Sequence, residues 1–276
     1  AAGLPRLTAL SVRRGRGSDH RYLFRTGATT TMDSTAAALY VAEMKPGLKK
    51  VSGINPDYAW ERDSWSAFES AIKVLVPGVQ IIRGQTHELL AAEYDPEISI
   101  VRGAEVVHSS VWGRDAEALI EQGIPRELFR RSTLVMTAGG PTITRLGSRM
   151  PDGTIVGARG PFAMFAPDTA LHRWFRDAYR KCYSVPPTYP AYKMAQAILG
   201  VKSAWEKAQA ANGGTRPSQE QIAAAFEHSS FEGPAGRVEM SRGKGHQAAQ
   251  ETAYGTVRRV HGKRPCWSTC GAIRPP

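Results

Sequence analysis

The sequence has only three cysteines, Cys182, Cys266 and Cys270, which are too few for the disulfide framework of a small secreted domain. Cys266 and Cys270 also lack the further ligands that a zinc site requires, so we expect no bound metal and no other cofactor. Cys182 falls within a helical pattern beside two tyrosines, and we predict that it is a small buried hydrophobic residue. The sequence also lacks any run of about 18 apolar residues, so we predict no membrane-spanning helix.

The common catalytic signatures are missing as well. The sequence has no Gly-x-Ser-x-Gly motif, no phosphate-binding P-loop and no His-Glu-x-x-His motif. His108, which Ser109 and Ser110 follow at the end of a predicted strand, is the best single candidate for a catalytic residue. We favour a hydrogen-bonded structural histidine at that position. An enzyme built on an α/β fold stays open as an alternative, because a fold alone never excludes one.

Positive charge is plentiful, with a formal net charge of +11, but it is concentrated at the two ends of the chain. Residues 1–25 hold six arginines and one acidic residue, and residues 258–276 hold five basic residues and no acidic one. Each end therefore contributes +5, which leaves +1 for the rest of the sequence. A nucleic-acid groove needs positive charge spread over a folded face. We therefore predict no nucleic-acid partner.

Strand-like and helix-like segments alternate in the first half of the sequence. Strands are predicted at 49–54, 79–82, 105–108, 134–137 and 154–158, and helices at 32–44 (with Asp33 or Ser34 as its cap), 64–76, 96–101 and 115–122. This rhythm predicts parallel strands with crossover helices, which is an α/β doubly wound lobe. Ligands of such lobes bind beyond the carboxyl ends of the strands. The segments to examine for a site are therefore 55–62, 109–115 and 137–142.

After Gly160 the order of elements changes. Three helices are predicted at 168–183, 190–211 and 219–228, and two strands follow at 237–240 and 252–260. Helices and then strands, after one complete α/β lobe, indicate that the chain crosses to a second lobe and returns.

Six short segments carry a family pattern. They are YLFRT at 22–26, NPDYAW at 55–60, VVHSSVWG at 106–113, MPDG at 150–153, PPTYPAY at 186–192 and EGPAGR at 232–237. In this order and spacing they resemble the substrate-binding proteins of branched-chain amino acid ABC transporters. The resemblance covers about residues 20–257.

The resemblance implies the type I periplasmic-binding architecture, an α/β fold of two doubly wound lobes that close on a solute. Residues 48–159 would be the second lobe, and residues 1–47 and 160–248 would be parts of the first. Residues 249–276 would hold the last strand of the second lobe and an irregular tail. The strands and helices that open the first lobe in the family have no counterpart here, so we expect an incomplete first lobe.

The resemblance also implies ligand-binding residues at the second lobe. Trp60, with Tyr58 beside it, takes the place of an aromatic residue that packs on the ligand, although a core position is the alternative reading. Glu61 stands where relatives usually have glycine. Ser110, Trp112 and Asp115 fill the second ligand loop, and a helix N-cap is the favoured role of Asp115.

Three further ligand-binding positions follow from the same resemblance. Ser11 matches a hydroxyl-bearing loop of the first lobe, and Tyr189 would line the cleft from that lobe. Gly139 lies where the family places an acidic residue for the ligand's ammonium group. Residues 137–140 contain no carboxylate, which favours a solute that needs less negative charge there, such as an amide, a urea-like compound or an aromatic acid.

The sequence thus predicts a periplasmic receptor of an ABC importer that is not an enzyme. It would bind a branched-chain amino acid or a related small solute in the cleft between the lobes and dock on a membrane permease. A ligand-sensing regulatory module of the same fold and an inactive truncated fragment are the alternatives.

Overall fold

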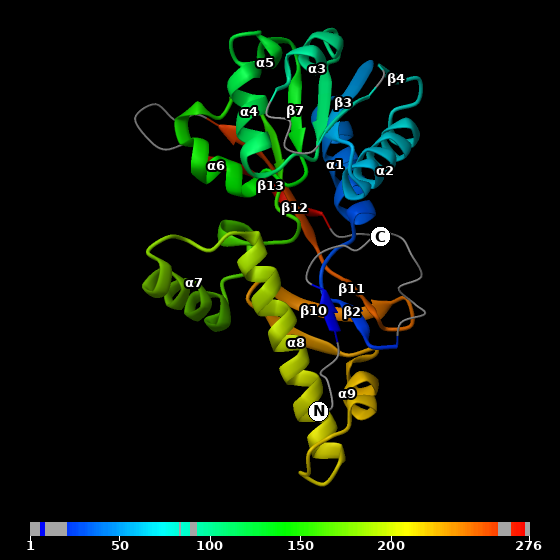
Figure 1. Ribbon diagram of the computed structural model, residues 1–276, viewed down its shortest axis with the longest axis vertical. Helices are drawn as coiled ribbons and strands as arrows, with labels where there is room; N and C mark the ends of the chain where they lie inside the picture. Colours follow the sequence, from blue (N-terminus) through cyan, green and yellow to red (C-terminus); the bar gives the residue numbers. More distant parts are fainter. Residues whose placement is uncertain (1–5, 9–20, 83, 89–92, 259–265, 274–276) are drawn as a thin grey trace. The chain divides into compact units, whose positions relative to one another are not determined.

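The computed structural model describes residues 6–8, 21–82, 84–88, 93–258 and 266–273, which form two compact units (Figure 1). Unit 1 contains the described residues up to Thr29 together with Gly160–Glu251. Unit 2 contains Thr30–Arg159 and Thr252–Ile273. The chain therefore passes between the units after Thr29, after Arg159 and after Glu251.

Unit 2 is built on a mixed sheet with the strand order β13-β12-β8-β7-β6-β3-β4, and β5 pairs with β3 beside this path. Its strands are β3 (Lys50–Pro56), β4 (Gln80–Ile81), β5 (Gln85–His87), β6 (Val106–Ser109), β7 (Thr133–Met136), β8 (Ile155–Gly157), β12 (Thr252–Arg258) and β13 (Cys266–Ile273). The strands from β3 to β8 pair in parallel, and β12 and β13 are antiparallel.

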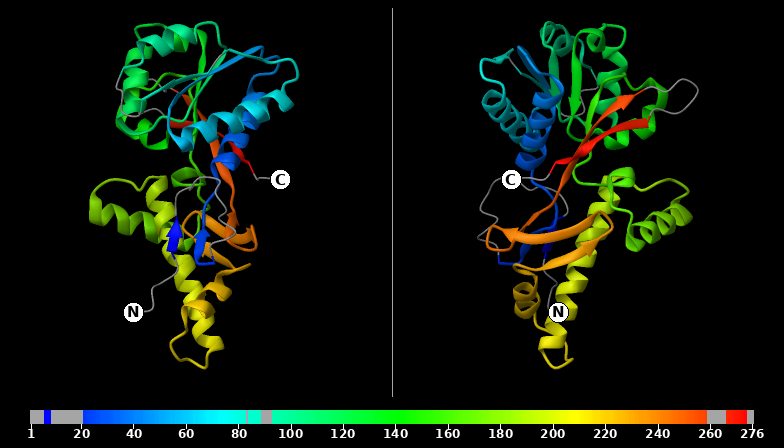
Figure 2. Two further views of the ribbon diagram at one scale, coloured as in Figure 1. Left: turned by 45° about the vertical axis from the view of Figure 1, so that its right-hand side comes forward. Right: turned by 180° about the vertical axis from the view of Figure 1, so that it is seen from behind.

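Helices cover both faces of this sheet (Figures 1 and 2). They are α1 (Thr30–Met44), α2 (Ala59–Leu75), α3 (Asp95–Ile100), α4 (Gly113–Gly123), α5 (Leu128–Arg131), α6 (Gly140–Leu146) and the 3-10 turn η2 (Gly147–Arg149). Successive residues of a strand point to opposite faces. Val106 accordingly joins a buried cluster with α1 and α2, whereas Val107 joins one with α3, α4 and α6. Two cores on the two faces of one largely parallel sheet confirm the predicted doubly wound α/β class.

Helix α1 belongs to unit 2, although the sequence analysis assigned residues 1–47 to the first lobe. Ala37, Tyr40 and Val41 are buried in the same cluster as Val51 of β3. The hydroxyl of Tyr40 also lies 2.9 Å from the Thr256 hydroxyl of β12. An alanine-rich helix offers an apolar face that fits either lobe, so the sequence pattern alone does not say which sheet it covers.

The end of the chain also differs from expectation. Residues 249–276 were expected to end in an irregular tail, but β13 pairs with β12 in an antiparallel register, with Arg258 opposite Cys266. The chain enters unit 2 at Thr252 rather than at 249.

Unit 1 contains a five-stranded sheet with the order β1-β2-β11-β10-β9. Its elements are β1 (Arg6–Thr8), β2 (Leu23–Arg25), β9 (Ser230–Gly233), β10 (Gly236–Arg242), β11 (Gln247–Ala249), the 3-10 turn η3 (Ala163–Phe165), α7 (Ala170–Tyr183), α8 (Tyr189–Ala211) and α9 (Gln219–Phe226). Phe24 of β2 lies at the centre of its core and stacks on Phe226 of α9, with ring centroids 4.7 Å apart. The buried residues of helices α8 and α9 therefore pack in one core with the strands of unit 1.

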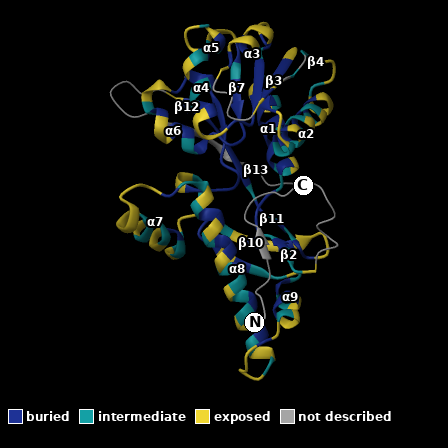
Figure 3. Cartoon of the chain, in the orientation of Figure 1, coloured by how far each residue is buried: buried dark blue, intermediate teal, exposed yellow. Residues whose placement is uncertain are grey.

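Helix α7 is largely exposed (Figure 3). A helix is predicted at 168–183, and α7 lies within it, but Trp174 on this helix is 63% exposed. Cys182 is exposed as well, so the prediction of a buried hydrophobic residue is wrong. His172 is the one residue of α7 that is buried, and a helix with so little buried surface cannot place Cys182 in a core.

Helix α9 supports a first test of the fold. Ser218 accepts a hydrogen bond from the Gln221 amide at 3.3 Å, and the Gln221 side chain accepts one from the Ser218 amide at 2.8 Å. We expect Ser218→Ala to lower the free energy of unfolding by about 1 kcal/mol, because the Gln221 amide loses the hydroxyl that accepts its hydrogen bond. Denaturant titration measures the change. Ser66→Ala on the exposed side of α2 is the control, and an equal effect of the two substitutions would contradict the capping role.

Candidate functional site

Polar side chains gather at the carboxyl ends of the parallel strands of unit 2. Asn55 lies near the end of β3, and Ser110, Thr137 and Arg159 follow β6, β7 and β8. All four residues are buried. Because parallel strands that neighbour one another end at the same edge of a sheet, these residues share one edge, which is where ligands of such sheets bind.

Asn55 and Ser110 connect the ends of two neighbouring strands. The side-chain oxygen of Asn55 accepts hydrogen bonds from the Ser110 amide at 2.9 Å and from the Ser110 hydroxyl at 2.8 Å. The Ser109 hydroxyl donates to the Ile54 carbonyl at 2.8 Å. Beside them, the buried Thr137 hydroxyl has no hydrogen-bond partner among the residues that the structure describes. The ends of β3 and β6 are thus hydrogen-bonded to each other, and the Thr137 hydroxyl remains able to bond.

Arg159 forms the most strongly paired part of the edge. Its Nε lies 3.1 Å from Oδ2 of Asp33 in α1, and the Thr252 hydroxyl donates to Oδ1 of the same carboxylate at 3.2 Å. Its guanidinium carbon lies 4.8 Å from the ring centroid of Trp60, within the range of a cation–π contact. Arg159 has a positive φ of 48°, which is costly for a residue with a side chain. These contacts hold the strained backbone in place.

Glu61 and Trp112 join the start of α2 to the loop after β6. Glu61 is completely buried, and its Oε1 accepts a hydrogen bond from the Trp112 indole at 3.1 Å. Oε2 is also buried, and no described residue bonds to it. Burial raises the pKa of the Glu61 carboxyl, and the hydrogen bond from Trp112 partly opposes this shift. The indole of Trp112 is about half exposed.

The structure brings four of the predicted ligand residues to this edge. Trp60 is half-buried beneath Arg159, Ser110 and Trp112 lie as described above, and Tyr58 precedes the first turn of α2 with half of its surface exposed. Asp115 lies buried in the first turn of α4. Since α4 begins at Gly113, Asp115 is not its N-cap, and the favoured capping role was wrong.

Gly139 precedes α6 and is buried against its neighbours. A Cβ atom added there would lie 2.8 Å from the Cβ of Met136 and 3.0 Å from a methyl of Val156. Such distances are too short for real side chains, so close packing requires glycine here. This packing gives Gly139 a structural role whether or not it contacts a solute.

Two of the predicted residues lie elsewhere. Ser11 falls outside the described residues, so the structure says nothing about its role. Tyr189 opens α8 in unit 1, where its ring lies 6.4 Å from that of Phe162. Tyr192, one turn further on, is a core residue whose hydroxyl lies 2.9 Å from Nε2 of His172.

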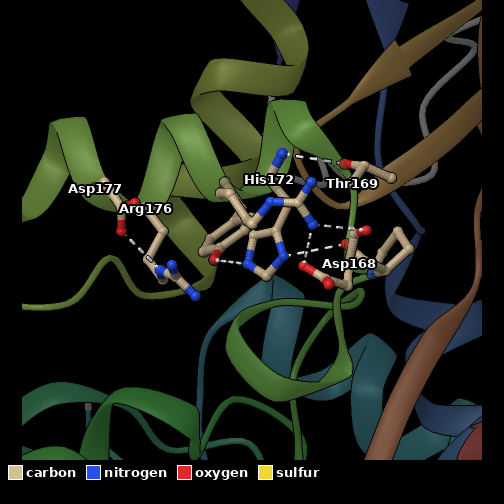
Figure 4. A network of polar contacts seen from close by, with 8 residues as sticks. Asp168, Thr169, His172, Arg176 and Asp177 are labelled. Atoms are coloured by element: carbon tan, nitrogen blue, oxygen red, sulfur yellow. Dashed lines mark hydrogen bonds and ion pairs between the residues drawn. The ribbon is translucent and has the colours of Figure 1, made fainter.

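His172 is the centre of a polar network in unit 1 (Figure 4). Its Nδ1 lies 3.1 Å from the Pro167 carbonyl, which can only accept, so Nδ1 carries the proton and Nε2 accepts from Tyr192. The Thr169 hydroxyl accepts from the His172 amide at 3.1 Å and caps α7. Both ring nitrogens of the buried His172 are therefore hydrogen-bonded, and a structural role is enough to explain this residue.

His108 is a core residue, but the prediction that it is hydrogen-bonded was wrong. Its ring stacks on Phe68 with centroids 4.5 Å apart, and Trp65 lies at 5.7 Å. Neither ring nitrogen has a partner in the part of the chain that the structure describes. Complete burial lowers the pKa of His108 to about 3, so the ring is neutral at ordinary pH. It packs as an aromatic residue against Trp65 and Phe68.

The sequence pattern did not point to Asp33 or Arg159 as site residues, and Thr137 was only part of the selected segment 137–142. Asp33 was interpreted as a helix cap, but α1 begins at Thr30 and Asp33 faces Arg159 instead. Arg159 directly follows the predicted strand at 154–158, so the carboxyl-end argument that selected the other loops could have found it.

The described parts of the chain contain no group of three or more histidine, cysteine or acidic residues that could hold a metal ion. Among the described helices, none combines the length and apolar character that crossing a membrane demands.

Comparison with known proteins places the chain in a family. Residues 2–262 match the periplasmic binding protein family, whereas a comparison with curated protein sequences found no significant match. Similar solved structures include an amino acid ABC transporter substrate-binding protein from Pseudomonas fluorescens, with 19% identity and a TM-score of 0.81 over 98% of this chain and 71% of that one.

Two further structures share the fold. A solute-binding protein of an ABC transporter from Rhodopseudomonas palustris, in complex with 3,4-dihydroxybenzoic acid, has 18% identity and a TM-score of 0.78 over 98% of this chain and 71% of that one. A leucine-, isoleucine-, valine-, threonine- and alanine-binding protein from Brucella ovis has 19% identity and a TM-score of 0.75 over 94% and 66%. With the family match over residues 2–262, the chain belongs to the periplasmic binding proteins.

Proposed function

We propose that the chain is a periplasmic solute-binding receptor of an ABC importer, which takes a small organic solute at the carboxyl edge of unit 2 and delivers it to a membrane permease. The observation that carries the proposal is the composition of this edge. The loops at this edge supply two tryptophans, Trp60 and Trp112, and the edge also holds buried polar groups without a full set of partners among the described residues, at Thr137 and Glu61. An apolar wall with a few fixed polar groups is what a small-molecule site requires.

The solute class follows from the same edge and from the relatives. The similar proteins from Pseudomonas fluorescens and Brucella ovis are described as binding amino acids, and the one from Rhodopseudomonas palustris holds an aromatic acid. Both kinds of solute combine an apolar body with a small polar group, which suits an indole face beside buried oxygens. A branched-chain amino acid, an amide, a urea-like compound or an aromatic acid is therefore the class to test.

The test is a thermal-shift screen followed by calorimetry, with leucine, valine, benzoate, 4-hydroxybenzoate, acetamide and urea. A solute at about a hundred times its dissociation constant stabilises the folded chain by about 2.7 kcal/mol, which raises the melting temperature by several degrees. We expect at least one solute of the screen to do so. A chain that melts cooperatively and responds to none of them would contradict the proposal.

Trp60→Ala tests the location of the site. We expect it to weaken binding of the selected solute about tenfold or more, because the solute loses the buried face of an indole. Trp174→Ala, on an exposed tryptophan of α7 in unit 1, is the matched control and should leave the affinity unchanged. Equal affinities for wild type and Trp60→Ala would place the solute elsewhere.

A further inference from the structure

The buried carboxylate of Glu61 has more bonding capacity than the described residues use. Glu61 has no exposed surface, and only one of its two oxygens is bonded by another side chain, the indole of Trp112 at 3.1 Å. Oε2 is buried without a partner among the residues described. An ionised carboxylate has about four lone-pair sites and donates nothing, so its missing partners must be donors. Buried polar atoms in folded proteins are normally bonded, so this atom requires an explanation.

The charges around Glu61 do not balance. A buried cation of this edge is Arg159, which lies over the neighbouring Trp60 ring and whose guanidinium is bonded to Asp33. Two buried carboxylates, Asp33 and Glu61, therefore share one buried guanidinium. Arg62 is a further cation near Glu61, but it is half-exposed and forms an ion pair with Asp57. A buried carboxylate is costly unless it is paired and hydrogen-bonded, so the edge is completed by a group that brings N–H donors or positive charge.

Glu61 lies among residues expected at a solute site, because it is next to one tryptophan in the chain and hydrogen-bonded to another that is partly exposed. Its neighbour in the chain is Trp60, and its hydrogen-bond partner is Trp112, which comes from the loop after β6. Trp112 is about half exposed, so the bonded pair reaches from the buried carboxylate to accessible surface. The hydrogen bond from Trp112 to Oε1 restrains the carboxylate, and Oε2 remains a buried acceptor without a partner among the described residues.

We propose that Glu61 determines the specificity of this site by accepting an N–H donor of the solute at Oε2, so that amidinium, ammonium and amide solutes are preferred over carboxylates of the same shape. This inference rests on the proposed function, because it assumes that a solute binds at this edge. Hydrogen bonds between a charged acceptor and an N–H donor belong to the stronger class. A solute carboxylate would bring a second negative charge to a desolvated one, and such repulsion is an effective means of discrimination.

Matched solutes test this preference directly. Benzamidine, benzamide and benzoate share one shape and differ in charge and donors, and isoamylamine, isovaleramide and isovalerate form a second, aliphatic set. Calorimetry measures the affinity of the full chain for each. We expect the wild type to bind the cation and the amide of at least one set tenfold or more tighter than the carboxylate.

The substitution Glu61→Gln supplies the decisive comparison. Glutamine keeps an acceptor for Trp112 but removes the charge, so the affinity for the cation should fall about tenfold or more and that for the carboxylate should rise. Glu69→Gln, on the same helix and paired only with Lys73 on the surface, is the matched control and should change neither. If Glu61→Gln fails to melt cooperatively, Trp112→Phe replaces it. Removing the indole N–H frees the carboxylate to rotate, and the preference should then fall at least threefold.

The contrary results separate this inference from the proposed function. A carboxylate bound as tightly as its amidine or amine, or a preference that neither Glu61→Gln nor Trp112→Phe changes, overturns the role of Glu61 and leaves a solute-binding receptor standing. Binding of leucine with no binding of either matched set does the same. If nothing binds to a chain that melts cooperatively, the proposed function fails, and the role of Glu61 fails with it.

Discussion

Replacing Asp33 by alanine is expected to lower the free energy of unfolding by about 3–5 kcal/mol. The side chains of Asp33 and Arg159 are 2% and 10% exposed, and their bonded atoms lie 3.1 Å apart. Alanine would leave the guanidinium buried without its bonded carboxylate and would deprive the Thr252 hydroxyl of its acceptor. Leaving one partner of a buried pair uncompensated costs more than the pair contributes, because the remaining charge stays desolvated.

A double-mutant cycle checks this origin. Arg159→Met combined with Asp33→Ala should be less destabilising than the sum of the two single changes, because the double variant leaves no buried charge from this pair. Asp168→Ala removes a comparable contact, at 2.8 Å from Arg173, but from an exposed pair. It should cost less than about 1 kcal/mol. If denaturant titration gives Asp33→Ala and Asp168→Ala similar effects, the buried pair does not stabilise the fold as described.

His108→Leu is expected to remove a large part of the chain's sensitivity to acid. Burial lowers the pKa of folded His108 to about 3, whereas an unfolded histidine titrates near pH 6.5. Between these values the unfolded state binds a proton that the folded state does not bind. Stability is therefore lost as the pH falls below about 6.5, by about 1.4 kcal/mol per pH unit from this group. Leucine does not titrate, so the variant should lose about 2 kcal/mol less between pH 6.5 and pH 5.

The free energy of unfolding of wild type and variant is measured by denaturant titration at several pH values. The contributions of the carboxylates that both proteins share cancel when the two pH profiles are subtracted. At neutral pH the two stabilities should be close, because both ring nitrogens of His108 lack partners in the described structure and leucine fills a similar volume. Parallel pH profiles for the two proteins would show that His108 is not buried in its neutral form.

The sequence predicts most of the local structure of this chain. The sequence predicts helices at 190–211 and from residue 219, where the structure has Tyr189–Ala211 and Gln219–Phe226. Such features depend on residues close together in the chain. The sheet to which α1 packs depends on contacts with residues as distant as Thr256, and no periodicity encodes them.

The site was predictable to a smaller extent for the same reason. The resemblance identified Trp60 and Trp112, but it gave Glu61 only as a departure from glycine. Its bond to Trp112 joins residues 51 positions apart, and the pair of Asp33 and Arg159 spans 126 positions. Each partner is an ordinary charged or aromatic residue in its own segment, and only the fold makes them neighbours.

The position of Asp33 in the chain gives its carboxylate a mechanical role. Asp33 follows the first passage between the units by a few residues, Arg159 immediately precedes the second, and Thr252 immediately follows the third. The Asp33 carboxylate bonds to both Arg159 and Thr252. The three chain connections are therefore linked by hydrogen bonds where they leave unit 2. A force applied to any one connection is therefore distributed over all three. A single-molecule stretching experiment should find that Asp33→Ala lowers the unfolding force and lets the connections detach one at a time.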